Sequence, residues 1–257
     1  MKKTNSNGKS KRTKVTNIII IIVAACFFVT GVVLLLIDPI KSRMRMNITE
    51  DALTSIEAQI SKNALNTAET GEETTESTPI TIIVPKEGFE VAGESYDFYG
   101  EEEELQELYN EVEDMEANLP DNISLTCIGI LKIDKINLNL PCWHVASRVA
   151  LRYGLGHYEE SVMPGESGNS TILGHRNQHT STMFYRLKEV KKNDTVRFLL
   201  PSGRELVYKV KEVKFVSPEH LVENIVGDAS SSERLTLVTC ATERGKGYRR
   251  LVICVPK

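Results

Sequence analysis

Residues 125–143 read LTCIGILKIDKINLNLPCW, two apolar runs on either side of the turn signal Asp134-Lys135. Runs of this length and composition predict two antiparallel strands joined by a tight turn. Further strands are predicted over residues 170–173, 195–200, 205–216, 235–239 and 250–255, with turn signals such as Pro201-Ser202-Gly203 between them. Many short strands with few helices indicate a β-barrel or sandwich over residues 122–257 and disfavour a parallel α/β fold.

Charge is distributed unevenly along the 257 residues, although 41% hydrophobic and 26% charged residues are ordinary for a globular protein. This composition excludes a wholly disordered chain, a collagen and a polytopic membrane protein. Residues 1–37 carry six Lys and Arg and no Asp or Glu, residues 38–121 carry five against 22, and residues 122–257 carry 20 against 13. The three parts predict a basic leader, an acidic spacer and a folded domain. The bases of the last part are scattered, so no nucleic-acid partner is expected.

An uncharged run of 20 residues, 18–37, follows the six basic residues of the leader. At about 1.5 Å per residue, a helix of that length spans the roughly 30 Å hydrocarbon core of a membrane. The positive-inside rule then places the tail, residues 1–17, in the cytoplasm and the chain after Asp38 outside. A cleaved signal peptide fits less well, because its apolar core has only about 7 to 15 residues. A lipoprotein signal ending at Cys26 is also disfavoured, since the run continues for eleven residues beyond it.

Residues 38–121 are predicted to form an extracellular spacer. Residues 67–79 are almost entirely Thr, Glu, Ser, Ala and Gly, which is typical of a solvated linker. A short stalk helix is possible before this linker, because three apolar residues stand at helical spacing: Leu53, Ile56 and Ile60.

An acidic helix is predicted near the end of the spacer, at about residues 101–119. One apolar stripe marks it, formed by Leu105, Leu108, Val112 and Met115. Two interpretations stay open for this helix. It is either a solvated acidic helix or one that docks on the positively charged domain behind it.

The predicted extracellular domain contains four cysteines, at positions 127, 142, 240 and 254. A two-residue turn at Asp134-Lys135 would oppose Cys127 and Cys142, so a disulfide between them is conceivable. Two buried free thiols are favoured, because a directly opposed pair is a strained place for a disulfide and small register errors are common. Cys254 alternates with Val252 and is expected in the core.

Cys240 stands where an apolar strand, residues 235–239, passes into a polar loop that contains glycine. Its sulfur is therefore expected at the mouth of a strand, where a nucleophile belongs. His175 ends another predicted strand, and Arg249 and Arg250 stand at the start of the last one. A cysteine nucleophile needs a thiolate, an imidazole that takes and returns the proton, and a donor for the oxyanion, and these three residue types supply them.

In this order, the motifs LGHR at 173–176, TLVTC at 236–240 and RLVI at 250–253 resemble the sortases, the cysteine transpeptidases of Gram-positive surfaces. The resemblance covers about residues 123–257 and includes CIGILKI at 127–133, GLGHY at 154–158 and PGESGN at 164–169. It implies a mainly β fold, a closed eight-stranded β-barrel with short helices.

The resemblance also implies roles for individual residues. His175 would be the acid/base, Cys240 the nucleophile and Arg250 the oxyanion or substrate-orienting donor. Arg250 is preferred to Arg249, because the arginine of the family directly precedes an apolar strand. Thr239 is either a strand residue or a substrate-orienting hydroxyl. His157 is expected to be structural, and no motif supports His144, His179 or His220.

The reaction of the family is a two-step acyl transfer. Cys240 would attack the Thr-Gly bond of an LPxTG-like signal near the C-terminus of a secreted protein. An amine of the cell-wall cross-bridge or of a pilin lysine would then resolve the thioester. This chemistry needs no cofactor, no His and Cys pair has zinc-ligand spacing, and no acidic cluster supports a calcium site.

Two other functions stay open. An L,D-transpeptidase is also a cysteine enzyme of the cell wall, but Cys240 lacks the SxGC setting of that family. The other is a catalytically inert, membrane-tethered binding barrel. Within the sortases, a chain that ends directly after its last strand, and residues 95–99 that do not match a DP-aromatic lid, favour wall anchoring over pilus building.

Overall fold

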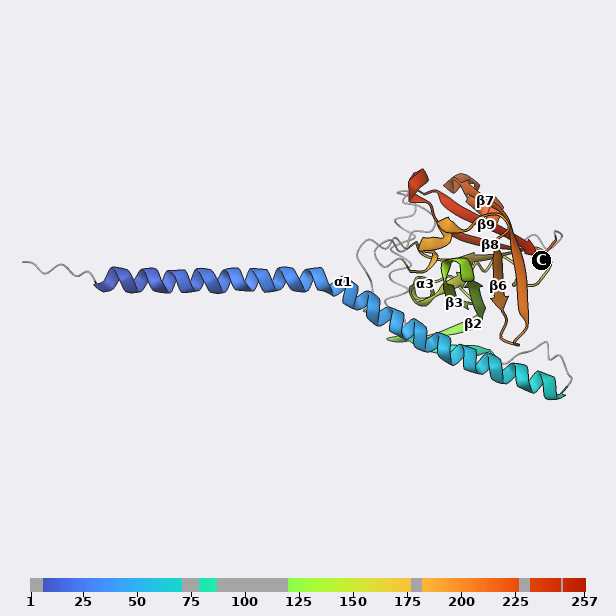
Figure 1. Ribbon diagram of the computed structural model, residues 1–257, viewed down its shortest axis with the longest axis horizontal. Helices are drawn as coiled ribbons and strands as arrows, with labels where there is room; N and C mark the ends of the chain where they lie inside the picture. Colours follow the sequence, from blue (N-terminus) through green and yellow to red (C-terminus); the bar gives the residue numbers. More distant parts are fainter. Residues whose placement is uncertain (1–6, 71–78, 87–119, 177–181, 227–231, 246) are drawn as a thin grey trace, which may run out of the picture.

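Eight strands close into a barrel in the computed structural model, which describes residues 7–70, 79–86, 120–176, 182–226 and 232–257 except position 246 (Figure 1). The strands follow the order β2-β3-β4-β5-β8-β9-β7-β6, and β6 pairs back with β2. Their bounds are β2 (Asn122–Ile133), β3 (Leu138–Trp143), β4 (Leu155–His157), β5 (Asn169–Leu173), β6 (Thr195–Leu199), β7 (Glu205–Val216), β8 (Arg234–Cys240) and β9 (Arg249–Pro256). The closed eight-stranded barrel predicted from the sequence is confirmed.

The turn between β2 and β3 is longer than the sequence predicted. Ile133 pairs with Leu138, and the four residues between them form the 3-10 helix η1 (Asp134–Ile136) and Asn137, which is left-handed with φ 51°. The register therefore sets Cys127 opposite Trp143 and Cys142 opposite Gly129. The two thiols are not directly opposed, and both are buried and free, as expected for core cysteines.

A ninth strand, β1 (Ile80–Pro85), pairs antiparallel with the first half of β2, from Ile80 opposite Cys127 to Pro85 opposite Asn122. The second half of β2 pairs with β6. The sheet thus extends beyond the point at which the barrel closes. Neither β1 nor the three-residue strand β4 was predicted.

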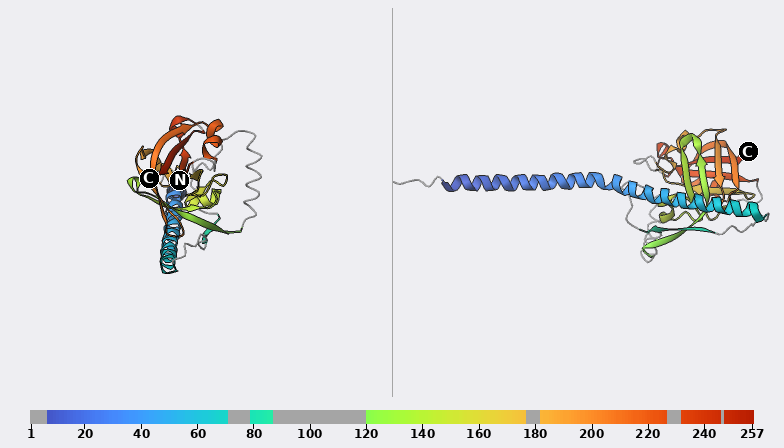
Figure 2. Two further views of the ribbon diagram at one scale, coloured as in Figure 1. Left: turned by 90° about the vertical axis from the view of Figure 1, so that its right-hand side faces the viewer. Right: turned by 60° about the horizontal axis from the view of Figure 1, so that its bottom comes forward.

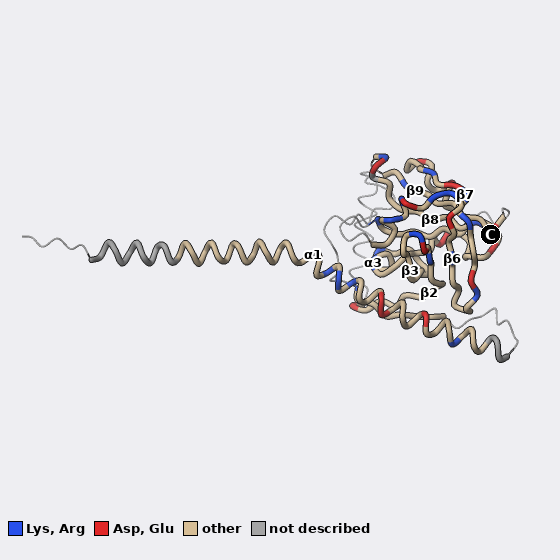
Figure 3. The backbone as a smooth tube through the Cα atoms, in the orientation of Figure 1, with Lys and Arg blue, Asp and Glu red and all other residues tan. Residues whose placement is uncertain are grey.

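A single helix, α1 (Asn7–Thr70), precedes the barrel and contains Pro39. Its first part stands away from the barrel, whereas its second part lies along it (Figures 1 and 2). The apolar side chains from Ile19 to Ile37 are largely exposed, and no charged residue interrupts this part of α1 (Figure 3). Among the described residues, α1 is the one helix long and apolar enough to cross a membrane.

Residues 38–70 and 80–85, which the sequence assigned to the spacer, lie in α1 and β1 and so have regular structure. Three apolar side chains of α1 are buried, Ala52, Ile56 and Ile60, and they share a core cluster with Trp143 and Tyr153. The outer face of the barrel supplies the partner that a solitary stalk helix would lack, so the helix is stabilised by packing. The acidic helix predicted at 101–119 lies outside the described residues.

Two short helices cover the barrel close to the C-terminal ends of β5 and β8. They are α3 (Arg148–Tyr153) and α4 (Leu221–Ile225), and η3 (Pro218–His220) leads into the second. Leu221 and Ile225 of α4 pack on Leu173 and Val238 from the outer face of the sheet. The interior of the barrel is filled by a separate cluster that includes Leu237 and Val252.

Candidate active site

Cys240 ends β8 and continues the row of side chains on the outer face of the barrel. Leu235 and Leu237 belong to the interior cluster, whereas Val238 packs under α4. Because successive side chains of a strand point to opposite faces, Cys240 lies on the same face as Val238. Its side chain is partly exposed, whereas the other three cysteines of the barrel are buried.

His175 follows β5, which runs parallel to β8. Leu173 stands beside Val238, and the Gly174 amide continues the pairing by donating to the Val238 carbonyl at 3.1 Å. His175 and Cys240 each follow this pair by two residues, so they stand at corresponding positions just beyond the paired parts of β5 and β8. The His175 carbonyl accepts from the Phe184 amide at 2.9 Å, which fixes the backbone on its other side.

A hydrogen bond between Thr239 and Gly174 joins the end of β8 to the residue that follows β5. The Thr239 hydroxyl donates to the Gly174 carbonyl at 2.7 Å and is buried. A Cβ atom at Gly174 would lie 2.5 Å from a ring carbon of Phe184 and 2.7 Å from a methyl carbon of Leu155, so no larger residue fits there. Of the two roles predicted for Thr239, these contacts favour a strand residue over a hydroxyl that orients the substrate.

The two candidate arginines differ in their surroundings. Arg249 lies directly opposite Cys240, and Arg250 lies opposite Thr239. Directly opposed side chains share a face, so the register puts Arg249 on the Cys240 face. Arg249 is buried, however, and its guanidinium donates to the Gly247 carbonyl at 2.7 Å and the Tyr248 carbonyl at 3.3 Å.

Arg250 belongs to a cluster of charged and aromatic side chains at the end of the barrel. Its Nη2 donates to Oε1 of Glu243 at 2.8 Å, and Oε2 of Glu243 lies 3.4 Å from Nη1 of Arg176. The guanidinium carbons of Arg250 and Arg244 each lie 4.5 Å from the centroid of the Phe215 ring, within range of a cation–π interaction. The hydrogen bond to Glu243 and the stacking on the Phe215 ring therefore hold the guanidinium of Arg250 in position.

Glu243 carries the negative charge of this cluster and stands in η4 (Thr242–Arg244), in the loop after Cys240. Burial alone would raise its pKa, but the hydrogen bond from Arg250 and the charges of Arg176 and Arg250 outweigh burial and lower it. Glu243 is thus an anion at neutral pH. Sequence reasoning missed Glu243 and Phe215, because no motif marks them and only the fold brings them to Arg250.

The buried cysteines are poor nucleophiles. Burial raises the pKa of the Cys127 thiol to about 11 and that of Cys254 to about 12. Burial likewise raises the pKa of Cys142, and the nearby Cys127 raises it further. Because the thiolate is the reactive form, these three thiols stay protonated at neutral pH.

The remaining histidines lie outside this constellation. Nε2 of His157 is 2.9 Å from the Val162 carbonyl and 3.0 Å from the Ser161 hydroxyl, and burial is the main cause that lowers its pKa. These contacts fit the structural role predicted for it. The ring of His144 lies 6.4 Å from that of His157, His220 is 68% exposed, and position 179 lies outside the described residues.

Residues 131–256 match the family model of the Sortase domain. The chain carries a sortase domain. The resemblance to sortases found in the sequence is confirmed for these residues.

Two curated relatives of this sortase domain are sortase D of Bacillus subtilis and sortase A of Streptococcus agalactiae. The first is 37% identical over 112 residues, 44% of this chain and 53% of the relative. The second is 28% identical over 158 residues, 58% of this chain and 60% of the relative. The chain thus matches little more than half the length of these relatives.

Solved sortase structures are also similar to the chain. The crystal structure of sortase C1 from Streptococcus agalactiae has 28% identity and a TM-score of 0.46, covering 51% of this chain and 67% of that one. Sortase C-1 from Actinomyces oris has 23% identity and a TM-score of 0.47, with 77% and 97% covered. The curated relatives are named sortase D and sortase A, so the subclass is left unassigned.

Proposed function

We propose that the protein is a membrane-anchored cysteine transpeptidase in which Cys240 is the nucleophile and His175 the general acid/base. The parallel register of β5 and β8 supports this proposal, because Leu173 stands beside Val238 and His175 and Cys240 each follow two residues later. Arg250, held by Glu243 and Phe215, is the proposed donor to the oxyanion.

The reaction has two acyl transfers. The Cys240 thiolate attacks the carbonyl carbon of the scissile peptide bond, and the guanidinium of Arg250 stabilises the oxyanion of the tetrahedral intermediate. His175 protonates the leaving amine as the peptide bond breaks, which leaves a thioester on Cys240. An acceptor amine then gives a proton to His175 and attacks the thioester, so a new amide forms and the Cys240 thiolate is restored.

The substrate and the location follow from the family and from the N-terminal helix. We propose an LPxTG-like signal of a secreted protein as acyl donor, cleaved between Thr and Gly, and an amine of the cell wall or of a pilin as acceptor. The apolar residues 18–37 would span the membrane, with the six bases of the leader on the cytoplasmic side and the barrel outside.

Mass measurement of the full chain tests this function. Incubation of the detergent-solubilised protein with a library of LPxTG-like peptides should add the acyl part of one peptide to Cys240, and an added amine should remove it. Cys240→Ala should give no adduct and unchanged circular dichroism, because a partly exposed strand end leaves little cavity. Retained turnover in this variant would refute the proposal. A Cys240 thiol whose alkylation rate did not depend on His175 would favour an inert binding barrel.

A further inference from the structure

We infer that α1 holds the barrel at a fixed distance from the membrane with its Cys240 end turned towards the bilayer, so that the distance of a cleavage motif from the membrane decides how fast it is cleaved. This inference rests on the proposed function. Three observations carry it: the direction of β8 and β9, the contacts that fix α1 on the barrel, and the short helical distance between those contacts and the apolar part of α1.

The strand directions give the orientation of the site. β9 runs from Arg249 to Pro256 and ends beside the C-terminus, which lies at the end of the barrel remote from the apolar part of α1 (Figures 1 and 2). β8 is antiparallel to β9, and Cys240 pairs with Arg249 at the start of β9. Cys240 therefore lies at the opposite end of the barrel, the end that faces the apolar part of α1.

Apolar contacts fix one face of α1 on the barrel. Ala52, Ile56 and Ile60 are 4%, 0% and 3% exposed, and they pack in one cluster with residues of β1, β2, β3 and α3. These three residues stand on one face of the helix, which turns by about 100° per residue. Rotation of the helix about its axis would expose all of them.

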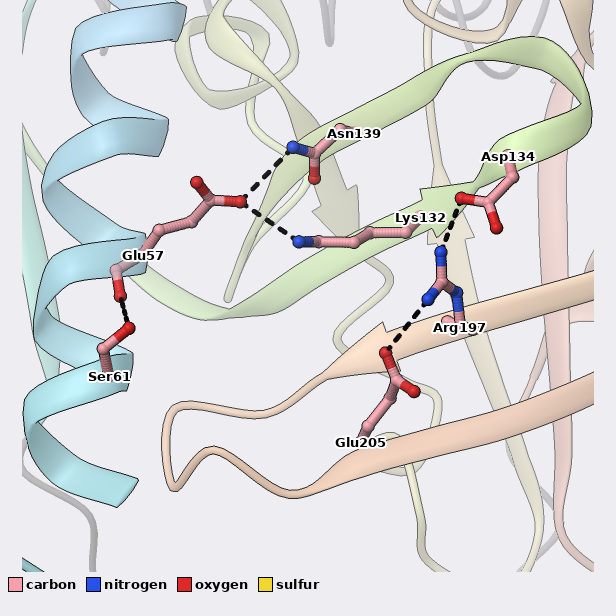
Figure 4. A network of polar contacts seen from close by, with 7 residues as sticks. All are labelled: Glu57, Ser61, Lys132, Asp134, Asn139, Arg197 and Glu205. Carbon is pink, nitrogen blue, oxygen red and sulfur yellow. Dashed lines mark hydrogen bonds and ion pairs between the residues drawn. The ribbon is translucent and has the colours of Figure 1, made fainter. Parts of the chain in front are cut away.

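Polar contacts fix the position of α1 along its axis. One carboxylate oxygen of Glu57 accepts from Nζ of Lys132 at 3.1 Å and from Nδ2 of Asn139 at 3.3 Å (Figure 4). Further along, Nδ2 of Asn63 donates to the Pro201 carbonyl at 3.0 Å. A Cβ atom at Gly203 would lie 2.6 Å from the Cβ of Ala64, so this turn lies flush against the helix.

The distance from these contacts to the apolar part of α1 is short. Ala52 stands fifteen positions after Ile37, which is about 22 Å of helix at 1.5 Å per residue. Pro39 removes one helical hydrogen bond and bends the helix, but α1 continues through it. The barrel is thus joined to the membrane span by a helix of defined length.

A site held in this way prefers a cleavage motif at one distance from the membrane. Among substrates anchored in the bilayer, the enzyme should therefore select by the length of the segment between the motif and the membrane. A soluble peptide carrying the same motif reaches Cys240 from any direction, so its rate of cleavage does not depend on how α1 holds the barrel.

Cleavage by the full chain in liposomes tests the inference. The substrates are peptides in which 2 to about 20 residues separate the LPxTG-like motif from a membrane-spanning segment, and the same motif as a soluble peptide. Two variants carry eleven extra residues between Ile40 and Lys41, either helix-forming Ala, Glu and Lys or flexible Gly and Ser. Eleven residues are close to three full turns, so the helical insertion lifts the barrel by about 16 Å and keeps its orientation. The flexible insertion has a similar mean length of about 18 Å but no fixed direction.

The parent enzyme should show a sharp optimum of spacer length. The helical insertion should move that optimum outward by about five residues, since an extended chain spans about 3.3 Å per residue. The flexible insertion should flatten the optimum, and all three proteins should cleave the soluble peptide at equal rates. An optimum that was the same in all three proteins would overturn the inference. Failure of the proposed function is distinguishable, because the parent would then not cleave the soluble peptide.

Discussion

Arg250 is fixed by side chains from two other segments, and this arrangement needs the planar guanidinium. Replacement by Lys leaves a single ammonium, which cannot stack on Phe215, pair with Glu243 and donate to an oxyanion at once. We expect Arg250→Lys to lower the rate of Cys240 acylation by about 10²-fold or more, the size of a lost oxyanion donor. Single-turnover cleavage measures this rate. Arg249→Lys is the matched variant, and a larger loss there would move the role to Arg249, which faces Cys240 in the register.

Glu243 is expected to position Arg250. Glu243→Gln keeps the shape of the side chain but removes the charge that pairs with Arg250 and Arg176. We expect kcat for peptide cleavage to fall several-fold with little change in KM, and Glu243→Asp to recover part of the loss. Glu205→Gln is the control, because Glu205 also pairs with an arginine, Arg197, at 3.7 Å. Glu205 begins β7, and it is the other end of β7, at Val216, that pairs with Arg249 beside the site. A faster Glu243→Gln enzyme would show that Glu243 blocks Arg250 instead.

His157 should make the stability of the barrel depend on pH. Burial lowers its pKa below the ordinary value of 6.5, so the folded state binds its proton less readily than the unfolded state. Its contribution to stability is fully present above pH 6.5 and is lost as the pH falls through the folded pKa.

Thermal unfolding between pH 7.5 and about 5 measures this contribution. The melting temperature of His157→Gln should depend less on pH than that of the parent, whereas His220→Gln, at an exposed position, should follow the parent. Parallel curves for the parent and His157→Gln would mean that other groups cause the acid sensitivity.

The sequence predicted those elements whose hydrophobic pattern or motif lies within the element itself. The strand cores of β2, β7 and β8 carry long apolar or alternating runs, and Cys240 and His175 stand in motifs at strand ends. β4 has only three residues, too few for any period. β1 has a run of β-branched residues, ITIIV, but polar segments flank it, so the sequence indicated part of a spacer there. Docking of α1 depends on a distant surface, which periodicity alone does not reveal.

The docked part of α1 should contribute to the stability of the barrel. Ile56 is fully buried between α1 and the sheet, so Ile56→Ala loses apolar contacts and leaves a cavity. We expect a decrease of about 2 to 5 kcal/mol in the free energy of unfolding. Leu65→Ala is the control, since Leu65 stands on the same helix and is 67% exposed. Equal effects of the two substitutions in urea denaturation would mean that α1 is a detached stalk.

The folding unit of the whole molecule is larger than the segment that matches the family model. Residues 131–256 match that model, yet one core cluster joins α1, β1, β2, β3 and α3. Arg152 of α3 donates to the Lys86 carbonyl, and the Tyr153 hydroxyl donates to the Pro85 carbonyl at 2.9 Å. Removal of everything before residue 122 therefore uncovers the outer faces of β2 and β3, including Leu125 of β2 and Trp143 of β3.

Chains that begin at residues 40, 79 and 122 should melt in that descending order. The first keeps α1 on the barrel, the second keeps only β1, and the third lacks both and leaves the first half of β2 as an unpaired, apolar edge that favours aggregation. Thermal unfolding and cleavage of a soluble peptide should be measured on all three. We expect the chain from residue 40 to cleave the peptide as the full chain does, because Cys240 and its neighbours lie far from the removed span. If the chain from residue 122 melted at the same temperature as the chain from residue 40, the contacts of α1 and β1 would contribute nothing to the fold, and the barrel alone would be the stable unit.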